Sequence, residues 1–116
     1  MTTDEKLVLI VDKLLVKTQD GLCNWKKYGG GKFRLGTIIA DIQIYTDYPC
    51  NHTYNIVMTI WCDNMVIASI SADHKEREDT LVRLFEHVKA YHEKYVNERM
   101  DDVMKEINKL GEDKPF

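Results

Sequence analysis

The sequence has only three cysteines, Cys23, Cys50 and Cys62, and no Cys-x-x-Cys pair. An odd number without close pairs does not suggest a disulfide framework. Thiolate and imidazole suit zinc, so Cys50 and Cys62 with His52 and His74 are candidate ligands. Structural zinc sites usually show two closely spaced pairs, and only one such pair is present here. We therefore expect reduced cysteines, no disulfide and no bound zinc.

Long apolar runs are also missing. No stretch approaches the roughly 18 residues that a membrane span requires. The first six residues, Met1 to Lys6, lack the basic start of a signal peptide. The formal net charge of −3 gives no bulk attraction to nucleic acid or to anionic membranes. These absences predict a cytoplasmic protein that binds no membrane, and they make a nucleic-acid partner a poor fit.

Motifs that fix a reaction are absent as well. No Gly-x-x-x-x-Gly-Lys-Ser/Thr loop occurs, and His87 and His92 are five residues apart rather than the four of a helical metal pair. No nucleophile with its base can be argued from spacing. We therefore expect a protein that is not an enzyme and that uses no cofactor.

What the sequence does contain is a run of strand-like segments between Gly36 and Ser71. Alternation of apolar and polar residues predicts three strands there: Thr37–Tyr45, Thr53–Cys62 and Met65–Ser71. Short connections, including a two-residue turn at Asp63-Asn64, predict an antiparallel meander. One predicted face is apolar and needs a cover: Ile38, Ala40, Ile42, Ile44, Tyr54, Ile56, Met58, Ile60, Cys62, Val66, Ala68 and Ile70. The other face is mixed, with an apolar patch formed by Ile39, Val57, Trp61 and Ile67.

Helices are predicted before and after these strands. The first is opened by Thr2 and Glu5, spaced as a capping box, and stops at Asp20-Gly21. The last is predicted to be capped by Asp73 and to end at Leu110. A short edge strand is expected over Cys23–Tyr28. The prediction is an α+β fold with an N-terminal helix, an antiparallel sheet of three or four strands and a long C-terminal helix, in which residues 1–111 form one domain and residues 112–116 a frayed tail.

The last helix is too long for a compact domain. Thr80 to Leu110 would span about 46 Å, whereas a compact chain of this length has a radius of gyration of about 13 Å. Its apolar face also rotates by about a quarter-turn. The first half carries Leu81, Leu84, Phe85, Val88, Tyr91 and Tyr95, and the second half carries Val96, Met100, Val103, Met104, Ile107 and Leu110. The second half therefore either bends back near Asn97 or packs against another surface.

A basic stretch rich in glycine precedes the strands, and no acidic residue occurs between Asp20 and Asp41. Glycine amides and cations suit a phosphate group, and aromatic rings can stack on a base. A site for an anionic ligand would use Trp25, Lys26, Lys27, Tyr28, Lys32, Phe33 and Arg34. The alternative is a flexible hairpin tip with solvated lysines and Trp25 in the core.

The order Leu15, Lys17, Thr18, Gly21 and Trp25 resembles the opening of a diffuse group of small bacterial and phage-type proteins. In that group a helix ends in Leu-x-Lys-Thr, a glycine follows, and a tryptophan comes four residues later, before strands and a helix. The group is largely uncharacterised. The resemblance implies an accessory or mobile-element origin and assigns no activity.

Two functions follow from these observations. The first is a self-associating accessory protein that acts by binding, most simply as a two-fold dimer. Its interface would use the apolar second half of the last helix together with Ile39, Val57, Trp61 and Ile67, surfaces that one chain does not easily cover. The second is a binding or sequestering protein for a nucleotide or other phosphate compound. The partners expected are a second copy, another protein or an anionic small molecule.

Overall fold

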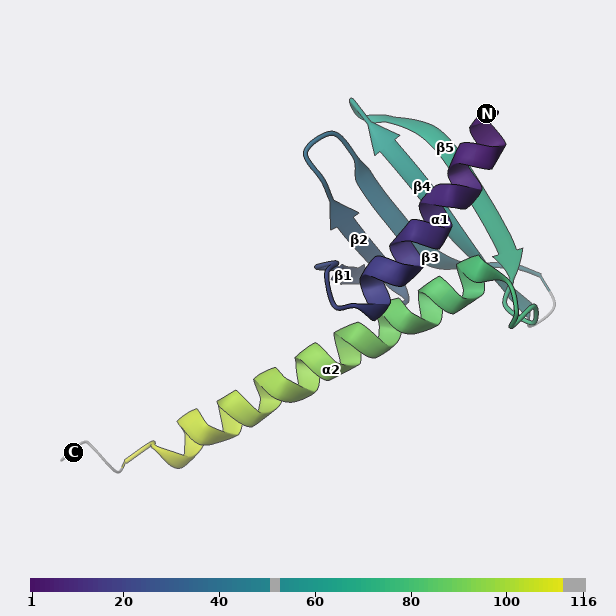
Figure 1. The fold of residues 1–116 in the computed structure, drawn as a ribbon. Coiled ribbons are helices and arrows are strands. Elements are labelled where there is room, and N and C mark those ends of the chain that lie inside the picture. The colour runs from purple at the N-terminus through teal and green to yellow at the C-terminus, as the bar shows by residue number, and fades with distance from the viewer. Residues whose placement is uncertain (51–52, 112–116) are drawn as a thin grey trace.

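The computed structural model describes residues 1–50 and 53–111, with the backbone alone at 48–50 and 53. The fold is α+β, as predicted (Figure 1). The elements are α1 (Thr3–Gln19), β1 (Lys26–Gly29), β2 (Lys32–Gly36), β3 (Asp41–Cys50), β4 (Thr53–Cys62), β5 (Met65–Asp73) and α2 (Thr80–Asn108). The sheet has five strands instead of three or four. The predicted frayed tail at 112–116 lies outside the described residues.

The sheet is a meander with the strand order β1-β2-β3-β4-β5, and every neighbouring pair is antiparallel. This confirms the predicted connectivity. Asp63 and Asn64 both have positive φ, 52° and 63°, which is the backbone of a tight two-residue hairpin turn. Asn51 and His52, in the preceding connection, lie outside the described residues.

The predicted strand at Thr37–Tyr45 is wrong at its start. Residues 37–40 form a turn in which the Thr37 hydroxyl accepts a hydrogen bond from the Ala40 amide at 3.0 Å. Ile38, predicted on the core face, is fully exposed at 104%, and Ile39 is exposed at 78%. The chain reaches this turn from β2, a strand for which the sequence analysis makes no prediction. Isoleucine favours strands, so local pattern gave no sign of a turn here.

A bulge in β5 changes which side chains share a face. Ile60 pairs with Ala68, but Trp61 pairs with Val66, which leaves Ile67 as an extra residue. Val66 therefore lies on the same face as Trp61 and not on the core face where it was predicted. Alternation cannot reveal such an insertion, because each residue after it simply exchanges faces.

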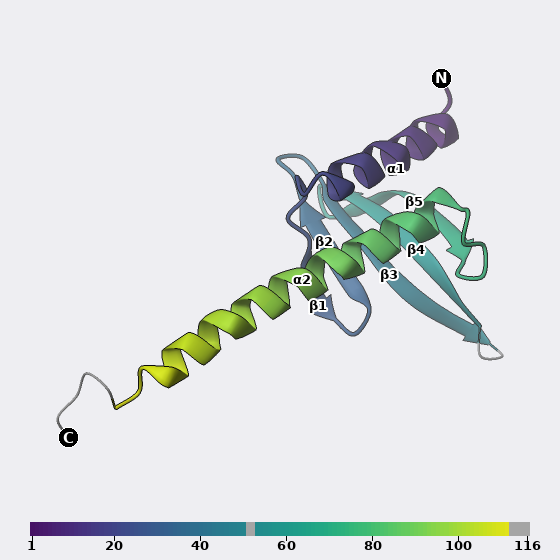
Figure 2. The same ribbon diagram turned by 60° about the horizontal axis from the view of Figure 1, so that its bottom comes forward.

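The core lies between one face of the sheet and the two helices, which both cover that face (Figure 2). The sheet contributes Ile42, Ile44, Ile56, Met58 and Ile60, all buried as predicted. The helices contribute Leu7, Val11, Leu15, Leu81, Leu84, Phe85 and Val88. The first half of α2 thus covers the sheet, as its apolar spacing predicted. The opposite face of the sheet has no helix over it, and we call it the open face.

The helix ends follow from local hydrogen bonds. Thr2 caps α1 by accepting from the Glu5 amide at 3.2 Å, as predicted. Asp79, and not Asp73, caps α2, with its carboxylate accepting from the Leu81 amide at 2.8 Å. The prediction failed because β5 continues to Asp73, which pairs with Asn55. The Asp73 carboxylate instead accepts from the Lys75 amide at 2.9 Å within the turn that leaves the strand.

The second half of α2 continues straight on, away from the domain (Figures 1 and 2). The helix is continuous through Asn97, so the alternative of a bend at that residue is excluded. Every residue from 93 to 110 is exposed. The molecule measures 67 × 37 × 26 Å and has a radius of gyration of 18.0 Å. Within the described residues, neither helix combines the length and the apolarity needed to cross a membrane.

Candidate functional site

The basic residues predicted as one cluster lie on a β-hairpin made by β1 and β2, with Gly30 and Gly31 at its turn. Lys26 pairs with Arg34 and Lys27 pairs with Phe33. Since neighbours along a strand point to opposite faces, Lys26, Lys32 and Arg34 share the open face. Lys27 lies on the helix-covered face with Phe33. The hairpin therefore divides the predicted cations between two surfaces.

Two of the three predicted aromatic residues belong to the core. Trp25 and Phe33 are only 2% and 3% exposed. The Trp25 indole Nε1 donates to the Thr18 hydroxyl at 3.0 Å, and the Phe33 ring meets the ring of Phe85 edge-on at 6.0 Å. Neither ring presents a free face to solvent. These two rings therefore cannot stack on a base, contrary to what the sequence had led us to expect. Trp25 and Thr18, both in the recognised sequence pattern, instead tie the end of α1 to the first strand.

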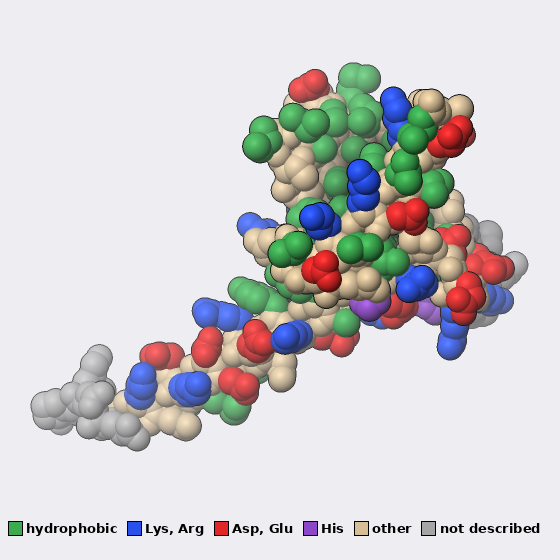
Figure 3. All heavy atoms as spheres, viewed as in Figure 1, with side chains coloured by type: hydrophobic (Ala, Val, Ile, Leu, Met, Phe, Trp, Pro, Cys, Tyr) green, Lys and Arg blue, Asp and Glu red, His purple; other side chains and the backbone are tan. Residues whose placement is uncertain are grey.

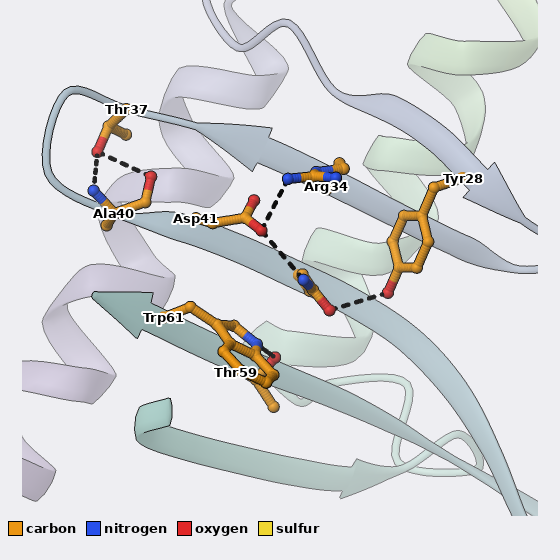
Figure 4. A network of polar contacts seen from close by, with 8 residues as sticks. Tyr28, Arg34, Thr37, Ala40, Asp41, Thr59 and Trp61 are labelled. Carbon is orange, nitrogen blue, oxygen red and sulfur yellow. Dashed lines mark hydrogen bonds and ion pairs between the residues drawn. The ribbon is translucent and has the colours of Figure 1, made fainter. Parts of the chain in front are cut away.

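Tyr28 and Arg34 belong to a polar network on the open face (Figure 4). The Tyr28 hydroxyl donates to Gln43 at 3.2 Å, and the Gln43 amide donates to Asp41 at 3.0 Å. Arg34 donates to the same Asp41 oxygen, also at 3.0 Å. Burial raises the pKa of the Tyr28 hydroxyl, and Tyr45 and Asp41 add to that rise while Arg34 opposes it. Tyr28 is therefore neutral and a donor at physiological pH, and Arg34 already has a carboxylate partner.

Lys27, the predicted cation that lies on the helix-covered face, lines a cavity of about 310 Å³ between the hairpin turn and α2. Lys27, Lys89 and His92 contribute positive or protonatable groups to its wall, and Glu93 contributes one carboxylate. Gly30 and Gly31 also line it. Gly31 has φ +64°, and a Cβ there would lie 2.8 Å from the Thr46 hydroxyl. Glycine is therefore the residue that fits this turn without strain.

An exposed apolar surface lies on the projecting half of α2 and the turn after it. Its members are between 43% and 77% exposed, and we call them the α2 stripe: Val96, Met100, Val103, Met104, Ile107 and Leu110. Lys, Arg, Asp and Glu side chains of both signs occupy the side of this segment that faces the viewer in Figure 3. Two exposed ion pairs lie along this segment, Arg99 with Asp102 at 3.3 Å and Lys109 with Glu106 at 3.8 Å.

Only some residues of the second predicted interface, on the sheet, lie close together in the structure. Ile39 and Trp61 line one shallow cavity of about 420 Å³ on the open face, together with Arg34 and Asp41. The Trp61 indole lies beside Thr59 and donates to its hydroxyl at 3.0 Å (Figure 4). Ile67 is exposed, whereas Val57 is partly buried and pairs with Tyr45 further along the sheet. This patch is broken by polar groups, unlike the α2 stripe.

The cysteines and histidines do not come together within the part of the chain that the structure describes. No group of three or more His, Cys, Asp or Glu there could hold a metal ion. Cys23 is buried and Cys62 partly buried, and both are free thiols. His74 stacks on Tyr54 with ring centroids 4.0 Å apart. The side chain of Cys50 and the whole of His52 lie outside the described residues.

Pattern reasoning missed two residues of the cavity, Lys89 and His92. Both lie on α2, more than fifty residues after the hairpin that they face. No local signal links them to Lys27, because only the packing of α2 on the sheet brings them near.

No protein-family model, curated protein or solved structure matches this chain.

Proposed function

We propose that this protein is a non-enzymatic, self-associating accessory protein of the cytoplasm that acts by binding, as a two-fold dimer. The observation that carries the proposal is the projecting half of α2, a helical segment with an apolar stripe and without a neighbour among the other described residues of its own chain. The resemblance of residues 15–25 to small phage-type proteins supports an origin in a phage or mobile element.

Helix stability supports this proposal. Isolated helices shorter than about 12–15 residues are marginal in water, because most helical stability in proteins comes from packing of the apolar face. The segment from Val96 to Asn108 continues the packed first half of the helix, but it packs on none of the other described residues of its own chain, so no burial of its apolar face stabilises it. Contiguous exposed apolar surface of this kind typically marks an interaction site. A partner helix on the α2 stripe would supply the missing packing.

The energy of burial favours a dimer. Burying an aliphatic side chain contributes roughly 1.5–3 kcal/mol. The α2 stripe has six such side chains in each chain. Since only the exposed 43–77% of each side chain can still be buried, the summed burial in the two copies contributes roughly 10–20 kcal/mol. This gain is comparable to or larger than the approximately 4–15 kcal/mol that association costs in lost freedom. In a two-fold dimer the same stripe serves both copies, so one surface suffices.

Sedimentation equilibrium of the unmodified protein tests this proposal. One chain has a mass of 13.6 kDa. We expect twice that mass at tens of micromolar, with a concentration-dependent return to the single-chain mass on dilution if association is weak. A single-chain mass throughout the micromolar range would contradict the proposal. The C-terminal stripe must be present in the sample, so the full chain should be used.

The cavity beside the hairpin favours a second function, the binding of an anionic ligand such as a nucleotide or other phosphate compound. Lys27 and Lys89 lie on two different elements that line the same space, and Gly31 places backbone at its mouth. Charge-assisted hydrogen bonds to phosphate contribute roughly 1.5–3 kcal/mol each. Glu93 opposes such a ligand. This proposal narrows the predicted cation set to Lys27 and adds Lys89 and His92.

Two matched pairs of lysines test the anion site. We expect inorganic phosphate or nucleotides at millimolar concentration to raise the melting temperature of the unmodified protein. Lys27→Gln with Lys89→Gln should weaken this binding at least about tenfold, since two charged contacts are lost. Lys26→Gln with Lys32→Gln removes the same charge from the open face and should leave the binding unchanged. Equal effects of the two pairs, or no stabilisation by any anion, would contradict the site.

A further inference from the structure

The α2 stripe has the spacing of a coiled-coil seam. Val96, Met100, Val103, Ile107 and Leu110 follow each other at intervals of four, three, four and three residues. Alternation of four and three keeps one narrow apolar line facing a partner helix, with side chains inserted between those of the partner. Met104 lies beside this line, one residue after Val103. A single helix of matching spacing is therefore the surface that fits the stripe best.

The residues that flank the seam indicate whether the two paired helices run parallel or antiparallel. Arg99 and Glu106 lie seven residues apart on one edge, each immediately before a seam residue, Met100 or Ile107. Both side chains are exposed. Residues at these edges form contacts between paired helices and set partner choice and direction. Glu98 and Lys105, also seven residues apart, lie on the side away from the seam.

We infer that the partner of the α2 stripe is the same stripe of a second copy, running antiparallel, with the two-fold axis between Asp101 and Asp102. This inference rests on the proposed self-association and gives it a geometry. In this arrangement Met100 meets Val103 of the second copy, and Val96 meets Ile107 of the second copy. Four of the five seam residues then lie against seam residues of the other helix, whereas Leu110, in the turn after α2, lies level with Glu93 of the second copy.

Charge favours the antiparallel direction. With this two-fold axis, the Arg99 edge of one helix runs beside the Glu106 edge of the other, and symmetry repeats the pair. Opposite charges therefore meet twice. In a parallel pair, the residues across from Arg99 and Glu106 are Met104 and Gly111, which offer no charge. A parallel seam extended by one step toward the domain would also bring together two copies of Glu93.

The shape of the chain favours the same direction. The domain occupies the N-terminal end of α2, and the projecting half extends from it alone (Figure 1). Antiparallel pairing places the two domains at opposite ends of the paired segment, where they do not compete for space. It also separates the two Glu93 residues by roughly 25 Å along the axis, at 1.5 Å per residue.

A double-mutant cycle tests the orientation. Dimer dissociation constants would be measured by sedimentation equilibrium at low salt for Arg99→Glu, for Glu106→Arg and for both together. Each single change places like charges across the seam twice, and we expect dimerisation to weaken on the order of tenfold. The double variant restores opposite charges between copies. It should therefore dimerise about as tightly as the unmodified protein, which is about a hundredfold more tightly than the sum of the two single effects predicts.

Changes within one chain do not imitate this result. Arg99 also pairs with Asp102, and Glu106 pairs with Lys109, within one chain. The two pairs share no residue, so the free-energy effects of losing them should be additive and give no coupling energy between Arg99 and Glu106. Glu98→Lys with Lys105→Glu is the matched control, with the same charges and the same spacing on the outer side, and should show no coupling. Purely additive effects in a chain that still dimerises would overturn the antiparallel direction alone. A chain that is monomeric before any substitution would overturn the self-association beneath it.

Discussion

We expect Met100→Glu with Ile107→Glu to convert the proposed dimer into a folded monomer. Each substitution places a carboxylate in the seam, and the dimer receives four of them. An uncompensated charge in a buried interface costs several kcal/mol, so we expect the dissociation constant to rise at least about a thousandfold. In the single chain both side chains are more than half exposed, at 56% and 58%. The domain therefore loses no internal contact, and glutamate retains the helix propensity of the segment.

The control for this variant adds the same charge elsewhere. Val8 and Leu22 are exposed apolar residues of α1 and the loop after it, far along the chain from the stripe. Val8→Glu with Leu22→Glu should remain dimeric. Both variants would be examined by sedimentation and by circular dichroism. Persistence of the dimer in the α2 variant, or unfolding of its domain, would show that the stripe has a different role.

Phe85→Ala will destabilise the domain by about 3–5 kcal/mol, the usual cost of removing a buried aromatic ring. Phe85 is 1% exposed and lies on the sheet-facing side of α2, where its ring meets Phe33 edge-on. Lys89 adds a cation 5.7 Å above the ring. Small domains have total stabilities of only about 5–15 kcal/mol, so this one change removes a large share. Urea denaturation would measure it as a shift of the midpoint.

Tyr95→Ala is the matched comparison on the same helix. Tyr95 is an aromatic residue that is 53% exposed, beyond the part of α2 that the sheet covers. We expect a loss of less than about 1 kcal/mol, as for most surface substitutions. Measuring both in the Met100→Glu, Ile107→Glu background separates domain stability from dimer stability. Equal losses would contradict the division of α2 into a packed half and an associating half.

Strand alternation predicted the sheet where one face is buried and the other is not. Ile44 and Met58 pair across two strands and are both fully buried, as their spacing indicated. The prediction failed at the turn over residues 37–40 and at the bulge near Ile67. Both failures have one cause: strand-forming side chains occupy positions where the backbone, and not the side chain, decides the structure.

The two candidate sites differ in how well they could be predicted from the sequence alone. The α2 stripe depends on residues in one helix, so its spacing alone predicted an apolar surface that the domain does not cover. The cavity of Lys27, Lys89 and His92 depends on two elements far apart in the chain. Sequence showed the first lysine as part of a basic stretch, but the sheet divided that stretch between two faces.

Hydrogen exchange across α2 tests the central claim most directly, because it locates the contact as well as detecting it. We predict slow exchange of the amides of residues 96–108 in the unmodified protein at tens of micromolar, and fast exchange in the Met100→Glu, Ile107→Glu variant. Without a partner this segment has no packing to hold its hydrogen bonds. The amides of Leu81 to Val88 should stay protected in both proteins. Equally fast exchange of residues 96–108 in the two proteins would contradict the claim that this half of α2 is where the protein associates.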